Sequence, residues 1–310
     1  MRATLMILLG LVLITMVRAQ SSYKIAPSAT NPAIDGRDTL HFASIDRTAT
    51  PLGKLFVFFP GTGASPGEYT LIVQTAARLG YHAIGLSYEN EIPPEFLCIT
   101  SADTTCHERS RREIWFGENV HEAINVDVDN SIYNRLVQLL KYLQTQHADD
   151  NWTQYLNASD SIIWSKVAFS GHSQGGGHAG IISKLEQVDR VIIFASRDYM
   201  AIYGEHAKWM QRPGKTPPDS YFGFTHRLDT NAYGLNHEIL DAWSHYQMDQ
   251  FGEIVSVDTV DAPFLNRHMF TSNLPEPPGS NVHHYYHRTV AGDLYTPHDE
   301  NGIPVYLPVW

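Results

Sequence analysis

The sequence predicts an α/β fold with a mainly parallel central sheet and helices on both faces. Apolar runs typical of buried strands alternate along the chain with segments that have the spacing of amphipathic helices. One predicted strand, residues 166–170, leads into Gly-His-Ser-Gln-Gly at 171–175, a strand-turn-helix pattern that can present Ser173 as a nucleophile. The 310 residues suit one large domain, or at most two smaller ones.

The elements are predicted in order along the chain. Residues 39–45 alternate apolar and polar side chains like an early strand. In residues 54–59, Lys54 is followed by five apolar residues, as expected of a buried parallel strand. Residues 68–79 have helical spacing and end at Gly80, a common helix stop. The remaining expected strands are 81–86, 166–170, 190–195, 221–225 and 268–272, and the remaining expected helices are 132–144 and 238–248.

Residues 89–128 are polar and irregular, and contain the two cysteines, Cys98 and Cys106. An insertion of this length is usually functional or mobile, so it is a candidate cap or lid, as are residues 199–220. In an oxidising compartment the two cysteines are expected to form a disulfide that pins a surface loop.

The first 19 residues have the pattern of a secretory signal peptide. Arg2 precedes an apolar run at 5–17, and short side chains at 17 and 19 fit a signal-peptidase site. The mature chain, 20–310, is therefore expected to be secreted as a single domain. A membrane anchor is the alternative, although the run is short for a span.

Charge and sequons bear on partners. The formal net charge of −11 argues against nucleic acid or anionic membrane surfaces as main partners. Asn151 and Asn157 lie in acceptor sequons and are predicted glycosylation sites if the host is a eukaryote. The oligomeric state does not follow from the sequence.

Reacting groups in such a sheet gather at the carboxyl ends of the strands. The glycine-rich turn at 60–63 follows the 54–59 strand and can aim a backbone N–H into the site. The N–H groups of Thr62 and Gln174 are therefore the predicted oxyanion-hole donors, with an ordinary tight turn as the alternative for 60–63.

The acid and the base are expected in the chain order Ser, Asp, His. Asp229 and Asp198 each follow a predicted strand, and Asp229 is preferred because the acid most often follows the later strand. His283, His284 and His287 all come after the last strand, and spacing alone does not choose among them. A zinc site at these histidines is not expected, since no helical or Cys-paired frame is clear. No metal or cofactor is predicted.

Together these motifs resemble the α/β-hydrolase superfamily over nearly the whole mature chain. The chain is most similar to a family of mostly microbial, often secreted serine hydrolases. That family has Trp-Ser-Lys-Val before Gly-His-Ser-Gln-Gly-Gly-Gly-His, as at 164–178, and Tyr-Phe-Gly-Phe-Thr-His-x-x-Asp, as at 221–229. Its tail has His, five residues and Asp, then Pro-Val-Trp, as in His287, Asp293 and 308–310. The resemblance implies His287 as the base, with His284 second.

One position departs from the pattern of many esterases. Pro60-Gly61 stands where they have His-Gly, but a backbone donor does not depend on that side chain. The predicted function is a secreted serine hydrolase that cleaves small-molecule or lipid-like esters through an acyl-enzyme. A peptidase, an acyltransferase or a catalytically inactive binding protein on the same scaffold are the alternatives. Trp115, Phe116 and Trp209 are candidate pocket residues, with core or surface packing as the alternative.

Overall fold

The computed structural model describes residues 20–230, 236–280 and 284–310. The predicted signal peptide, residues 1–19, and the candidate base His283 lie outside this part. The central sheet is formed by β1 (Gln20–Ile25), β2 (His41–Asp46), β3 (Leu55–Phe59), β4 (His82–Gly85), β5 (Val167–His172), β6 (Arg190–Phe194), β9 (Tyr221–His226), β10 (Val255–Ser256) and β11 (Met269–Ser272).

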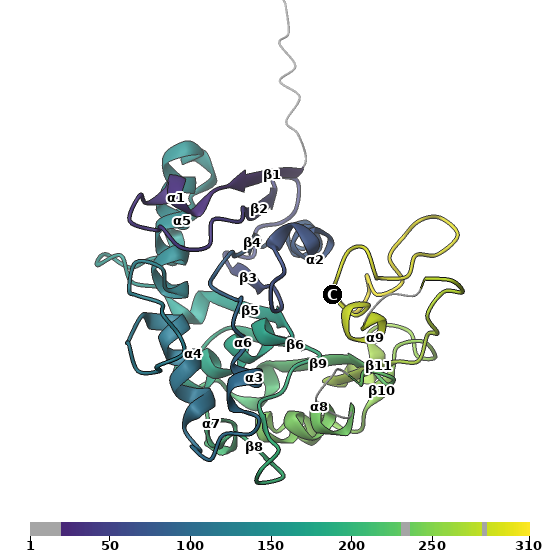
Figure 1. Cartoon of the computed structure of the whole chain (residues 1–310). Helices are drawn as coiled ribbons and strands as arrows, with labels where there is room; N and C mark the ends of the chain where they lie inside the picture. Colours follow the sequence, from purple (N-terminus) through teal and green to yellow (C-terminus); the bar gives the residue numbers. More distant parts are fainter. Residues whose placement is uncertain (1–19, 231–235, 281–283) are drawn as a thin grey trace, which may run out of the picture.

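The sheet has nine strands in the order β1-β2-β4-β3-β5-β6-β9-β11-β10 (Figure 1). The pairings β1–β2 and β2–β4 are antiparallel, and the other pairings are parallel. The predicted α/β class and mainly parallel sheet are therefore confirmed. A separate two-stranded hairpin consists of β7 (Tyr199–Met200) and β8 (Glu205–His206).

Helices flank this sheet. They are α1 (Pro27–Thr30), α2 (Thr70–Arg78), α3 (Pro94–Cys98), α4 (Cys106–Phe116), α5 (Ile132–Gln146), α6 (Gln174–Leu185), α7 (Lys208–Gln211), α8 (Asn236–Ala242) and α9 (Tyr285–Arg288). None of the helices in the described ranges combines the length and apolar character that crossing a bilayer requires.

The side chains of β3 show how the sheet is packed between two layers, one on each face. Leu55, Val57 and Phe59 join a core cluster with α4, α5 and α6, whereas Phe56 and Phe58 join a second cluster with α2 and the C-terminal segment. Successive side chains on a strand point to opposite faces, so a strand covered on both sides must be apolar throughout. Figure 1 shows α4 and α5 on one side of the sheet, and α9 with the C-terminal segment on the other.

Helix α5 follows its sequence pattern. Leu136, Leu139, Leu140 and Leu143 are fully buried on its inner face. The Ser131 side chain caps the helix by accepting a hydrogen bond from the Asn134 backbone N–H. The predicted helix is confirmed and runs two residues past residue 144.

The prediction of an irregular surface loop at 89–128 is wrong. This segment contains α3 and α4, and the predicted Cys98–Cys106 disulfide is present but buried between them. The polar composition indicates an exposed loop, but charged side chains of α4 are buried: Arg111 and Glu113 are each only 1% exposed. Buried charges of this kind need partners, which sequence alone does not reveal. A cap or lid role for residues 89–128 or for residues 199–220 stays a prediction.

Candidate active site

Ser173 lies in the turn between β5 and α6 with φ 54° and ψ −118°. A non-glycine residue rarely adopts this conformation, which is maintained only where surrounding structure imposes it. Side chains are excluded on both sides of the serine. A Cβ on Gly171 would overlap the Gly175 backbone, and a Cβ on Gly175 would overlap the Phe59 carbonyl group. These close approaches hold the turn and present Ser173 to a cavity.

The predicted acid and base are in contact. His287 Nδ1 and Asp229 Oδ2 are 2.8 Å apart, and the Asp229 side chain is fully buried. Burial alone would raise the pKa of Asp229, but the neighbouring His287 outweighs it and holds that pKa below its usual value. An ionised Asp229 selects the His287 tautomer with hydrogen on Nδ1, which leaves Nε2 able to accept a proton.

Ser173 and His287 line the same cavity. No hydrogen bond joins their side chains among the described residues. Catalytic hydrogen bonds are often loose without substrate and tighten in the Michaelis complex. His284, the second candidate base, also lines the cavity but is exposed, and it is His287 that contacts Asp229.

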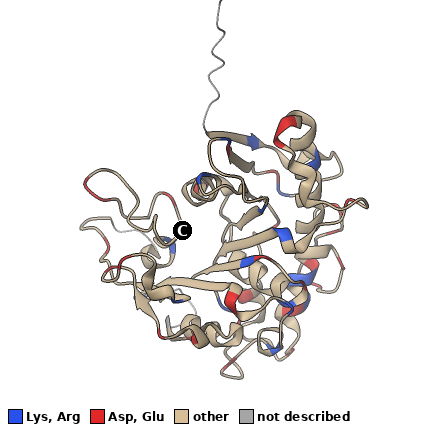
Figure 2. Ribbon diagram, turned by 180° about the vertical axis from the view of Figure 1, so that it is seen from behind, with Lys and Arg blue, Asp and Glu red and all other residues tan. Residues whose placement is uncertain are grey.

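Asp198, the alternative acid, is bound elsewhere. Arg111 Nε and Nη2 donate to its two carboxylate oxygens at 2.6 and 2.5 Å, and Trp209 Nε1 donates at 2.8 Å. Arg111 also donates to the carbonyl of Gln174, so this pair braces the start of α6. Acidic and basic residues are interspersed around α4 in Figure 2. The structure thus brings Asp229, and not Asp198, to the candidate base.

Both predicted oxyanion donors line the cavity. Gln174 is the first residue of α6, where backbone N–H groups have no partner within the helix. Thr62 Oγ1 donates to Gln174 Oε1 at 2.8 Å, which ties the two donor residues together. The N–H groups of Gly61, Gly63 and Ala64 are all hydrogen-bonded. The N–H of Thr62 has no partner within the described residues and is therefore available to a ligand.

Asn90 holds this turn and was not predicted. Its side-chain amide nitrogen donates to the backbone carbonyls of Gly61 and Ala64 at 2.6 and 3.0 Å, and its backbone carbonyl accepts from Gly63 N–H at 3.0 Å. Tyr88 adds a hydrogen bond from its hydroxyl to the Pro60 carbonyl. No motif marks Asn90 in the sequence, because its partners are fixed by the pairing of β3 with β4.

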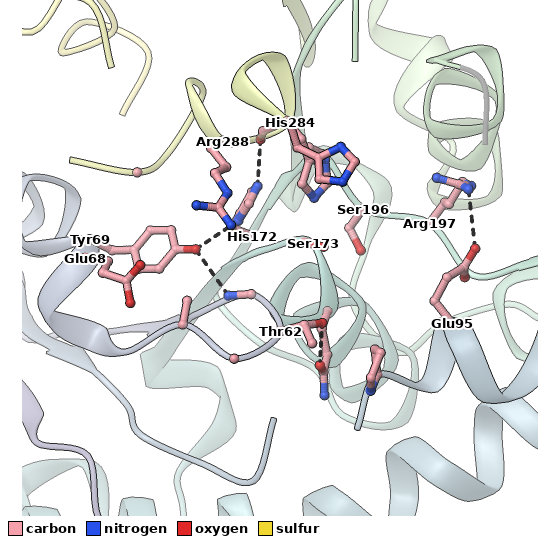
Figure 3. A pocket seen from close by; sticks show the side chains of 18 of the residues that line it. Thr62, Glu68, Tyr69, Glu95, His172, Ser173, Ser196, Arg197, His284 and Arg288 are labelled. Carbon is pink, nitrogen blue, oxygen red and sulfur yellow. Dashed lines mark hydrogen bonds and ion pairs between the residues drawn. The ribbon is translucent and has the colours of Figure 1, made fainter. Parts of the chain in front are cut away.

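The cavity has a volume of about 440 Å³. Figure 3 shows Tyr69 and His172 on one side of Ser173, and Arg197 and Glu95 on the other. The predicted pocket aromatics do not line it: Trp115 and Trp209 are buried in the core, and Phe116 packs against that core. The aromatic side chains that do line it are Tyr69, Phe96 and Tyr295.

The Glu95 side chain forms one charged wall of the cavity. Its carboxylate lies 3.4 Å from Arg197 Nη2, and Arg197 Nε lies 2.8 Å from Glu238. Burial raises the pKa of Glu95 to about 7, although the positive charge of Arg197 opposes the shift. Glu95 therefore changes charge near neutral pH.

This shift predicts a pH-dependent stability. The usual pKa of a glutamate is 4.5, so between pH 4.5 and about 7 the unfolded chain releases the Glu95 proton more readily than the folded protein does. The folded protein is therefore destabilised progressively as pH rises through this range. Glu95→Gln removes this destabilisation and leaves Arg197 its Glu238 partner. The difference in unfolding free energy between the variant and the wild type should therefore grow in favour of the variant, by up to about 3 kcal/mol, as pH rises from about 5 to about 8. Urea unfolding at both pH values measures it, and parallel pH profiles for the two proteins would contradict it.

Glu95, His107 and Asp198 place three potential metal-ligand atoms within 4.8 Å of one another. Asp198 is already neutralised by Arg111, whose positive charge adjoins the cluster and opposes a cation. The two predicted glycosylation sites, Asn151 and Asn157, are both exposed, and their modification stays a prediction.

The site brings a strained serine, an Asp–His pair and two backbone donors to one cavity. These are the parts that acyl transfer requires. No protein-family model and no curated protein sequence matches this chain.

Proposed function

We propose that the protein is a serine hydrolase of the α/β-hydrolase fold that cleaves carboxylic esters. The observation that carries the proposal is that Ser173 and the Asp229–His287 pair meet at one cavity. The fold assignment is supported by the strand order, and by a nucleophile that follows β5 while the acid follows β9 and the base follows β11.

The proposed reaction is transfer of the acyl group to Ser173, followed by hydrolysis. Ser173 Oγ attacks the ester carbonyl carbon while His287 Nε2 takes its proton, and Asp229 stabilises the resulting imidazolium. The carbonyl oxygen becomes an oxyanion bound by the N–H groups of Thr62 and Gln174. Each well-placed donor of this kind is worth about 3 kcal/mol in the transition state. The C–O bond then breaks and His287 returns the proton to the alcohol. Water, activated by His287, releases the acid from Ser173.

Secretion is part of the same proposal. The Cys98–Cys106 disulfide fits an oxidising compartment, and so does the signal-like pattern of the first 19 residues. The disulfide links α3, which supplies Glu95 and Phe96 to the cavity, to α4, which carries Arg111. It therefore stabilises one wall of the proposed substrate site.

A panel of p-nitrophenyl esters and peptide p-nitroanilides tests the proposal. The cavity is of limited volume and has charged walls, so acetate and butyrate esters should be turned over at least about tenfold faster, by kcat/KM, than dodecanoate. Anilides should be cleaved far more slowly than esters. Hydrolysis rates, with uncatalysed hydrolysis subtracted, provide the measurement. An enzyme inert to every ester would contradict the proposal and favour a binding protein, and preferred cleavage of anilides would indicate a peptidase.

A further inference from the structure

Two side chains outside the triad, Tyr69 and His172, lie between the turn at 60–63 and His287. Tyr69 Oη lies 3.0 Å from His172 Nδ1 and accepts a hydrogen bond from Gly61 N–H at 3.4 Å. His172 Nε2 lies 2.8 Å from the backbone carbonyl oxygen of His287. Figure 3 shows this row of contacts beside Ser173. It connects the turn that carries Thr62 to the residue that acts as base.

The direction of each hydrogen bond can be derived. His172 is 3% exposed, and burial, with the neighbouring His287, lowers its pKa to about 3, so the ring is neutral. The His287 carbonyl can only accept, so His172 carries its hydrogen on Nε2. His172 Nδ1 must then accept from the Tyr69 hydroxyl, whose pKa is raised by burial and which stays protonated. The chain of donors runs from Gly61 through Tyr69 and His172 to His287.

The packing leaves little freedom to these groups. A Cβ added to Gly61 would lie 3.1 Å from His172 Nδ1 and 3.4 Å from Tyr69 Oη. The Tyr69 ring also packs against Phe58 in the core, with ring centroids 4.8 Å apart. These contacts restrict the positions of Tyr69 and His172, so a shift of one side chain would also move the other.

A separate contact anchors the segment that follows His287. The Asp293 carboxylate accepts hydrogen bonds from Thr70 N–H at 2.8 Å, Thr70 Oγ1 at 2.6 Å and Leu71 N–H at 3.1 Å, at the start of α2. Asp293 N–H donates to the Glu68 carbonyl at 2.9 Å. Because this anchor uses neither the Tyr69 hydroxyl nor the His172 ring, losing the hydrogen bonds of those two groups should shift His287 without detaching its segment.

We propose that Tyr69 and His172 are positioning residues. They hold the turn at 60–63, which carries the oxyanion donor Thr62, and the catalytic His287 in a fixed position relative to each other. This inference rests on the proposed function. Neither side chain takes part in the chemistry, since the hydrogen bonds of His172 go to Tyr69 and to a backbone carbonyl. Their effect is on the distance between His287, Ser173 and the oxyanion donors. Small misplacements of reacting groups have large effects on rate.

Tyr69→Phe is the first test. It keeps the ring and removes the hydroxyl that orients His172 and accepts from Gly61. We expect kcat for a short ester to fall about tenfold, with KM changed by less than about twofold. Tyr306→Phe is the matched control, because it also removes a buried hydroxyl, one bonded to Ser272 Oγ at 2.8 Å in the same core cluster. The control should keep the wild-type kcat.

His172→Gln and His172→Leu give the second test. The glutamine amide can still donate to the His287 carbonyl, whereas leucine cannot, so Gln should retain at least about fivefold more kcat than Leu. A kcat for Tyr69→Phe within twofold of wild type, or an equal loss in Tyr306→Phe, would overturn the inference. Covalent labelling of Ser173 in the wild type by a serine-reactive phosphonate separates the two proposals. Without labelling the proposed function fails, and with labelling but unchanged kcat only the positioning role fails.

Discussion

Ser173→Ala is expected to lower kcat for ester hydrolysis by about a millionfold. In the proposed mechanism Ser173 forms the acyl-enzyme, so without it only weak stabilisation by the oxyanion donors would remain. The fold should persist, because alanine at 173 meets the same backbone strain as serine and removes no hydrogen bond of the Ser173 side chain among the described residues. Initial rates with a p-nitrophenyl ester, together with the thermal midpoint, measure both effects.

Ser183→Ala is the matched control for this substitution. Ser183 lies on the same helix, α6, and its buried hydroxyl donates to the Gly180 carbonyl at 2.6 Å, away from the cavity. Its loss should leave kcat close to the wild-type value. Turnover retained in Ser173→Ala, or lost equally in both variants, would contradict the role of Ser173.

Asp229→Asn is expected to lower kcat by about ten-thousandfold with little change in stability. The asparagine amide can donate to His287 Nδ1, which would place the imidazole hydrogen on Nε2 and prevent it from accepting the serine proton. Asp198→Asn should instead lower the stability and leave kcat per folded molecule little changed. It leaves the Arg111 guanidinium buried without its carboxylate, at a cost of about 3–5 kcal/mol of unfolding free energy.

The pair of variants separates the two candidate acids. Urea unfolding gives the stability of each variant, and active-site titration gives kcat per folded molecule. Asp198→Asn should keep a kcat per folded molecule near the wild-type value. A folded Asp229→Asn protein with full turnover, or a stable Asp198→Asn protein without turnover, would reverse the assignment.

Much of the sheet could be predicted from the sequence because burial on both faces leaves a direct signature. The run that became β3 is apolar throughout, as a strand covered on both sides must be, and β5 begins with the apolar residues 167–169. The Ser, Asp, His order was informative because strands in a parallel sheet bring residues distant in sequence to one edge. The sequence predicts neither β1, whose residues are mostly polar, nor β10. β10 has only two residues, too few for any periodicity.

The errors share a physical cause. The composition of α4 predicts an irregular loop, because its charged residues give no sign that they are buried with tertiary partners, as Arg111 is with Asp198. Trp115 and Trp209 were considered for the pocket, but their indole N–H groups reach partners inside the core, the His178 carbonyl and the Asp198 carboxylate. Local composition carries no information about such partners.

The same reason hid the residues that support the site. Tyr69 and His172 are 103 positions apart in the sequence, and His172 and His287 are 115 apart. Their contacts exist only once β5, α2 and the C-terminal segment have packed together. His172 was noted only as part of the Gly-His-Ser-Gln-Gly pattern.

Treatment with a serine-reactive organophosphonate, followed by peptide mass spectrometry, tests the central claim most directly. In the wild type the adduct should form at Ser173 and at no other serine, because the proposal places Ser173 in one cavity with the base His287 and with the backbone donors of Thr62 and Gln174. The Ser173→Ala protein should remain unlabelled under the same conditions. An adduct that persists in Ser173→Ala, or a wild-type protein that takes up no label, would contradict the assignment of Ser173 as the nucleophile.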